Sequence, residues 1–227
     1  MRPITLTAVI TILMFTGAVH AGAPKDAPPT LMLEPGKLLV DEPLNRPMGK
    51  EWFAKPGKWE IIDGVTRGSE RSEDMHGAVR RREVRFTSAI VTYQFRLDGA
   101  KMTTLSMNAE KGHVCRVKIS EDGFSVVRDK DKAKNDKPVV LDQRTIKIAP
   151  KEWHTLVVEM NGKDMLARLD GKEIAYGAHD SLAVLKASVG FTVQGEAVSF
   201  KNLRVYEGTL KSDWQKVRDR LLEQRKK

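Results

Sequence analysis

The stretch KEWHTLVVEMNGKDMLARLDGKEIA, residues 151–175, contains two turn dipeptides, Asn161-Gly162 and Asp170-Gly171, and apolar residues alternate with polar ones on both sides of each. Alternation with a period of two is typical of β-strands that bury one face. Asn-Gly and Asp-Gly favour the tight turns whose positive φ angles match the twist of the flanking strands. The stretch therefore predicts a three-stranded antiparallel meander.

The same alternation recurs in SAIVTYQFRL (88–97), TTLSMNA (103–109) and HVCRVKIS (113–120). In the last of these, strict alternation places His113 on one face with Cys115 and Val117. About a dozen short strands separated by turn signals favour a two-sheet antiparallel sandwich. No region alternates strands with helices, so a parallel α/β fold is not expected.

The beginning of the chain, MRPITLTAVITILMFTGAVHAG, combines a positive charge at Arg2, an apolar run and small residues around Ala21. This order is typical of a secretory signal peptide, so we predict that residues 1–21 are cleaved and that the protein is exported, periplasmic or extracellular. The alternative is an uncleaved membrane anchor. The apolar run from Ile4 to Phe15 is short for that role, because a membrane span needs roughly 20 apolar residues. We therefore expect no integral membrane span after signal cleavage.

The rest of the chain divides into three segments. Residues 22–36 are rich in Pro and Ala and predict a flexible linker. Residues 37–208 hold the predicted strands, and residues 209–227 predict an amphipathic helix with Ser212 as its N-cap. One apolar stripe of that helix is expected to dock it on the sandwich: Trp214, Val217 and Leu221. The fold class is therefore all-β with a short C-terminal helix.

The formal net charge of +9 favours anionic partners, acidic or sulfated glycans among them, although solubility alone is an alternative explanation. Nucleic acid is not an expected partner, because no nucleic-acid-binding motif is present and aromatic residues make up only 6% of the chain. Cys115 is the only cysteine, so no intramolecular disulfide can form. No cofactor is expected.

Three segments carry a resemblance to a known fold: LLVDEPLNR…EWFAKPGKWEIIDGV, the 151–175 meander, and GFTVQGEAVSFKNLRV. Together they resemble concanavalin A-like jelly-roll domains over about residues 37–207, and most closely the secreted 3-keto-disaccharide hydrolase-like family. The resemblance implies a jelly roll that binds carbohydrate and, in that family, hydrolysis of a glycosidic bond next to a 3-keto sugar. Related domains include lectins and glucanases, so the fold alone does not decide the activity.

Glucanases of this fold carry an E-x-D-x-E triplet, because retaining hydrolysis needs two carboxyl groups roughly 5 Å apart. The sequence has no such triplet, so glucanase chemistry is not expected. The 3-keto chemistry needs a proton acceptor instead, for which His76, His113 and His179 are the candidates. For His113 the alternative is a histidine that is simply satisfied at the end of a strand. The histidines lack the spacing of metal ligands, so no metal site is expected.

Cationic side chains on the polar faces of the strands suggest a binding surface. Gln94 and Arg96 share one such face, and Arg116 and Lys118 share another. If the two strands are neighbours, these side chains form a basic groove, in which arginine can bind a diol, carboxylate or sulfate through two hydrogen bonds. The segment GAVRRREVR adds two residues at the predicted rim: Arg80 and Arg82. The alternative is an ordinary charged outer face.

Trp52, Trp59 and Trp153 offer stacking faces for sugars, although such residues more often fill a sandwich core. Two functions from different classes therefore remain. The protein is either a carbohydrate-processing enzyme, or a non-catalytic lectin-like or structural envelope module that binds an anionic glycan.

Overall fold

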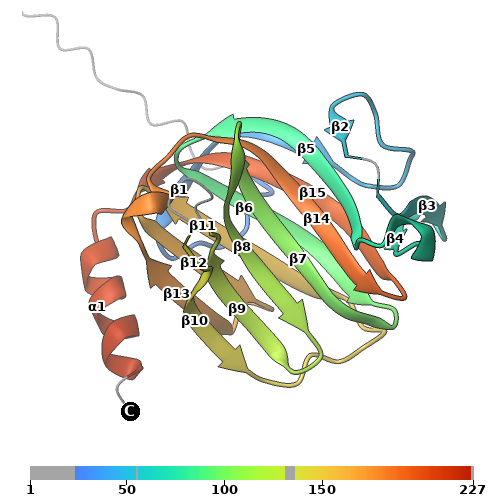
Figure 1. Cartoon of the computed structure of the whole chain (residues 1–227). Helices are drawn as coiled ribbons and strands as arrows, with labels where there is room; N and C mark the ends of the chain where they lie inside the picture. Colours follow the sequence, from blue (N-terminus) through green and yellow to red (C-terminus); the bar gives the residue numbers. More distant parts are fainter. Residues whose placement is uncertain (1–23, 55, 131–135, 226–227) are drawn as a thin grey trace, which may run out of the picture.

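The computed structural model describes residues 24–54, 56–130 and 136–225. Over these residues the strands form two packed antiparallel sheets, and one short helix follows near the C-terminus (Figure 1). The meander is confirmed: β11 (His154–Asn161), β12 (Asp164–Leu169) and β13 (Glu173–Ala178) pair in sequence. Its turns need positive φ angles, which are 53° at Gly162 and 49° at Asp170.

The eight-stranded sheet has the order β13-β12-β11-β6-β15-β4-β3, with β1 also paired to β15. Its remaining strands are β1 (Leu33–Glu42), β3 (Lys58–Ile62), β4 (Val65–Ser69), β6 (Ala89–Leu97) and β15 (Val198–Leu210). The seven-stranded sheet has the order β10-β9-β8-β7-β14-β5-β2. Its strands are β2 (Trp52–Phe53), β5 (Ala78–Phe86), β7 (Ala100–Ala109), β8 (Gly112–Ser120), β9 (Gly123–Arg128), β10 (Val139–Thr145) and β14 (Lys186–Gly195).

The inner faces of the two sheets form the main core, in which Tyr93, Phe95, Phe191 and Phe200 are among the largest buried side chains. At one edge the sandwich is closed, because β10 lies against β13 and the Asp142 carboxylate accepts a hydrogen bond from the backbone N–H of Tyr176. At the opposite edge β2 and β3 end the two sheets, and this edge is less tightly closed (Figure 1).

A second apolar cluster covers the outer face of the eight-stranded sheet. The helix α1 (Trp214–Gln224) lies at the side of the sandwich (Figure 1), where the Trp214 ring meets that of Tyr176 edge-on at 5.6 Å. Val217 and Leu221 pack against the same cluster, which confirms the predicted docking stripe. The predicted cap is wrong by one position, because Asp213 precedes the helix, without a side-chain capping bond. None of the helices among the described residues is long and apolar enough to span a membrane.

The segment before β1 is not a flexible linker where the structure describes it. Three successive backbone N–H groups, those of Leu31, Met32 and Leu33, donate to the carboxylate of Glu159 at 2.7–2.8 Å. The Glu159 side chain, on β11, is fully buried beneath them. Over residues 24–36 the prediction of a flexible linker is wrong, because Pro and Ala set only the local stiffness, whereas a buried carboxylate on β11 binds residues 31–33. The predicted signal peptide, residues 1–21, lies outside the described residues and stays a prediction.

A β-bulge corrects the predicted face of His113. Met107 pairs with Cys115, but the next residue, Asn108, pairs with His113, so Val114 is the extra residue. A bulge of this kind shifts the alternation by one position. Cys115 therefore points into the core while His113 lies on the outer face of the seven-stranded sheet.

Candidate functional site

The outer face of the seven-stranded sheet is called the open face below, because no α-helix of the described residues packs on it, whereas α1 packs against the apolar cluster on the other sheet (Figure 1). Directly opposed residues of antiparallel strands share a face, so the strand pairing arranges its side chains in rows across β5, β14, β7 and β8. One row holds Arg81, Gly190, Ser106 and Arg116; a second holds Glu83, Ser188, Asn108 and His113; a third holds Val79, Thr192, Thr104 and Lys118. The centre of this face is therefore polar, and its flanks carry the cations Arg81, Arg116 and Lys118 together with one carboxylate, that of Glu83.

Asn108 organises the floor of the open face. Its Nδ2 donates to the hydroxyl oxygens of Ser106 at 3.4 Å and Ser188 at 3.3 Å. Its Oδ1 must therefore accept, and the His113 Nδ1 lies 2.6 Å from it. Nδ1 consequently carries the imidazole proton, and Nε2 holds the lone pair in the neutral ring. Thr104, in the next row, has a buried hydroxyl group with no partner among the described residues.

Arg81 reaches across the open face toward His113. The strands β5 and β8 are three spacings apart, which is about 14 Å at the usual interstrand distance. The Nη2 atom of Arg81 nevertheless lies 3.5 Å from His113 Nε2, so the two side chains lean toward each other over the intervening strands. Gly190 leaves room for this path, since a Cβ atom there would lie 2.9 Å from the Cγ of Arg81.

Two guanidinium groups face each other across the centre. Burial lowers the pKa of Arg81, and the charge of Arg116 lowers it further. Arg116 itself forms an ion pair with Asp129, with Nη2–Oδ1 and Nε–Oδ2 distances of 2.5 and 2.9 Å. The Asp129 side chain is only 5% exposed and that of Arg116 is 25% exposed, so the guanidinium is the accessible partner. The repulsion between the two arginines would be relieved by an anion bound between them.

A cavity of about 670 Å³ adjoins this side of the open face. Its lining includes His113, Arg116, Lys118 and Asp129, and one wall comes from Ser181 of the short 3-10 helix η3 (Asp180–Leu182). The structure therefore brings three of the sequence-predicted residues together: His113, Arg116 and Lys118.

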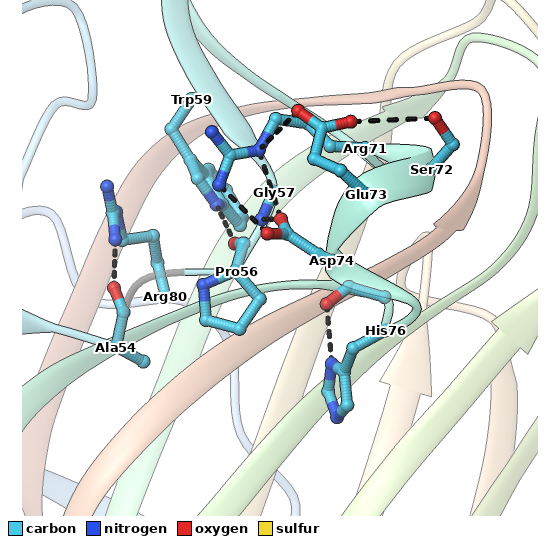
Figure 2. A network of polar contacts seen from close by, with 11 residues as sticks. Ala54, Pro56, Gly57, Trp59, Arg71, Ser72, Glu73, Asp74, His76 and Arg80 are labelled. Carbon is cyan, nitrogen blue, oxygen red and sulfur yellow. Dashed lines mark hydrogen bonds and ion pairs between the residues drawn. The ribbon is translucent and has the colours of Figure 1, made fainter.

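The other two candidate histidines lie elsewhere. His179 precedes η3, and its Nδ1 accepts the backbone N–H of Ser181 at 3.2 Å, so this ring caps the helix beside the cavity. His76 follows the 3-10 helix η1 (Ser72–Asp74), is exposed, and its Nδ1 lies 2.7 Å from the Gly77 carbonyl oxygen (Figure 2). It lines none of the main cavities among the described residues.

The predicted single basic groove is wrong, because β6 and β8 belong to different sheets. Arg96 lies on the outer face of the eight-stranded sheet, where it pairs with Asp98 at 2.8 Å and lies over the ring of Trp153. Gln94, on the same strand, accepts a hydrogen bond from Asn202 at 2.9 Å. Alternation fixes which residues share a face of one strand, but it does not say which strands are neighbours.

The assignment of Arg80 and Arg82 to the rim of that groove is also wrong. Both point between the sheets, since their partners on β14 are the core residues Phe191 and Val189. Arg82 Nε pairs with Glu42 of the opposite sheet at 3.0 Å. The residue between them, Arg81, is the one that reaches the open face.

The residues of the polar floor were not predicted from the sequence. The segment TTLSMNA carried a signal, because Thr104, Ser106 and Asn108 alternate with the core residues Leu105 and Met107. Small hydroxyl and amide groups at every second position of a central strand indicate a hydrogen-bonding face.

The one cysteine of the sequence, Cys115, points into the core beneath this face. Burial raises the pKa of the Cys115 thiol to about 12, which keeps it protonated. Among the described residues, no group of three His, Cys, Asp or Glu side chains is placed to hold a metal ion. The open face therefore offers hydrogen bonds, positive charge and one imidazole.

No protein-family model matches the sequence, and no curated protein matches it. Solved structures do match. The carbohydrate-binding module CBM66 from Bacillus subtilis has a TM-score of 0.57 at 13% identity, over 69% of this chain and 96% of that one. A Bacillus subtilis protein of unknown function with a galectin-like fold scores 0.61 at 12% identity, over 79% and 100%. The endo-β-1,3-glucanase from Pyrococcus furiosus scores 0.58 at 10% identity, over 77% and 95%.

The chain has a concanavalin A-like jelly-roll fold. The predicted fold class is therefore confirmed. At these identities the likeness concerns the fold alone.

Proposed function

We propose that this protein is an exported carbohydrate-binding module whose open face holds an acidic glycan. The observation that carries the proposal is the pair of guanidinium groups of Arg81 and Arg116 on one face, with Arg116 also lining the adjoining cavity. The arginines match a carboxylate or sulfate. The side chains of Ser106, Asn108 and Ser188 are nearly buried and hydrogen-bonded to one another, so they support this face from beneath. The named carbohydrate-binding module and glucanase of the same fold support a glycan as the ligand. Export rests on the predicted signal peptide.

Calorimetric titration tests the proposed preference for acidic glycans. The ligands are oligogalacturonate, a sulfated oligosaccharide and a neutral oligoglucoside, each at two salt concentrations. We expect the acidic sugars to bind more tightly than the neutral one. Added salt should weaken the binding of the acidic sugars, because it screens their attraction to the arginines. Arg81→Gln should weaken acidic binding about tenfold, because it removes one charge-assisted contact.

Arg96→Gln is the matched control, since Arg96 lies on the other sheet and should leave binding unchanged. Equal affinities for neutral and acidic sugars, or equal losses of affinity in Arg81→Gln and Arg96→Gln, would count against the open face as a site for anions.

A second candidate function is hydrolysis of a 3-keto-disaccharide, and the tautomer of His113 favours it. Its Nε2, which lies 3.5 Å from Arg81 Nη2, is the atom that would accept the proton from the carbon next to the keto group when substrate displaces the guanidinium. The glycosidic C–O bond then breaks by elimination, the leaving oxygen takes up a proton, and water adds across the resulting double bond. The resemblance to the 3-keto-disaccharide hydrolase-like family supports this chemistry.

Turnover of a 3-keto-disaccharide, followed by release of the free sugar, tests this second candidate. We expect His113→Gln to lower kcat by at least about 100-fold, the usual contribution of a general base, with little effect on KM. His179→Gln is the control, because that ring only caps η3. No turnover by the unaltered protein, or equal rates in the two variants, would leave binding as the function.

A further inference from the structure

A second cavity, of about 760 Å³, lies at the less tightly closed edge of the sandwich. It is separate from the open face, because it is formed by β2, β3, β4 and the inner side of β5. Most of its lining is apolar: Pro47, Met48, Trp52, Phe53, Trp59 and Ile61.

The indole rings of Trp52 and Trp59 form two walls of the cavity, and each packs against a core phenylalanine. Trp52 stacks on Phe191 with ring centroids 6.1 Å apart, and Trp59 stacks on Phe200 at 6.0 Å. Trp59 also lies across Gly68, where a Cβ atom would be 2.7 Å from its ring. Walls fixed in this way lose little freedom when a ligand binds, which favours affinity.

The hydrogen-bonding groups at this cavity are mainly donors. Trp59 Nε1 is used, since it donates to the Pro56 carbonyl at 3.2 Å (Figure 2). Trp52 Nε1 is buried and has no partner among the described residues. The carboxylate of Glu60 also lines the cavity, but it pairs with Lys58 at 2.8 Å.

Arg80 brings a positive charge to the lining of this cavity. Its guanidinium donates to the Ala54 carbonyl, and no carboxylate of the described residues lies within ion-pair distance (Figure 2). Arg71 and Arg82, by contrast, each pair with a carboxylate at 3.0 Å. Burial lowers the pKa of Arg80, and repulsion from Arg71 lowers it further. A partly buried cation of this kind is stabilised when an anion binds beside it.

We propose that this cavity is a second binding site, for a small aromatic carboxylate, with its ring among the indole and other apolar side chains and its carboxylate at Arg80. A sugar fits less well, because its several hydroxyl groups would find few partners on an apolar wall, and each unpaired group costs free energy. A ligand with one anionic group and a flat apolar body matches both the guanidinium and the lining.

Calorimetric titration of the full-length protein with indole-3-acetate, indole-3-acetamide and glucuronate tests this site. The amide keeps the ring and removes the charge, and glucuronate keeps the charge and removes the apolar body. We expect indole-3-acetate to bind, the amide to bind about tenfold more weakly, and an excess of glucuronate to leave the affinity for indole-3-acetate unchanged. Equal affinities for the acetate and the amide, or no binding of the acetate, would overturn the proposal.

Two substitutions locate the binding. Arg80→Met should reduce the affinity for indole-3-acetate to that for the amide, whereas Arg80→Lys, which keeps the charge, should give an intermediate value. Arg85→Gln is the matched control on the same strand, because Arg85 is exposed and pairs with Glu110. Indole-3-acetate binding that survives Arg80→Met would place the ligand elsewhere. The comparison of acid and amide uses the unaltered protein, so it decides the question without depending on how the variants fold.

Discussion

Glu159→Gln is expected to lower the free energy of unfolding by about 3 kcal/mol, because hydrogen bonds to a buried charged group are strong and an amide cannot replace all of them. One Glu159 oxygen accepts from both Met32 and Leu33 at 2.7 and 2.8 Å, and the other accepts from Leu31 at 2.8 Å. In glutamine one of these oxygens becomes an NH2 donor, which faces an N–H group in either orientation of the amide.

Urea denaturation measures the loss, and amide hydrogen exchange locates it. The backbone N–H groups of residues 31–33 should exchange faster in the variant, while those of the central strand β7 should change only with global stability. Glu173→Gln is the control, because Glu173 is exposed on β13. Equal denaturation midpoints for Glu159→Gln and the unaltered protein would mean that the segment before β1 is held by its apolar contacts and its other hydrogen bonds, such as that from Lys211 Nζ to the Thr30 carbonyl.

Most of the fold was predictable because each signal was local. The turn dipeptides around Gly162 and Gly171 specify the meander, and alternation along 88–97 specifies which residues face the core. The apolar stripe of α1 is likewise a local pattern. Glu159 shows the limit: a glutamate within an apolar strand gives no sign that a segment 126–128 positions earlier will bind it.

The candidate site was less predictable, because it depends on which strands are neighbours. Arg116 and Lys118 were identified from alternation, but Arg96 was joined to them although its strand lies in the other sheet. Arg81 was missed because it lies between two arginines that point the opposite way. The bulge at Val114, which turns His113 outward, has no strong sequence signal, since neither Gly nor Pro marks it.

Arg116→Met is expected to weaken binding of an acidic glycan at least about tenfold, because it removes a guanidinium that faces the polar floor. It should also lower the free energy of unfolding by about 2 kcal/mol, since the nearly buried Asp129 carboxylate loses its partner. Calorimetric titration and urea denaturation of the same samples measure the two effects.

Asp129→Asn should change binding in the opposite direction. Asparagine keeps the shape of the side chain and one oxygen for Arg116, but it removes the negative charge that competes with the ligand for the guanidinium. We expect a loss of stability together with tighter binding of the acidic sugar, by about threefold to tenfold, and no change for a neutral sugar. If the ion pair only supports β8 and the loop after β9, both substitutions should weaken binding to a similar degree. Opposite effects on affinity, with stability lowered in both variants, would therefore identify Arg116 as a residue that contacts the ligand.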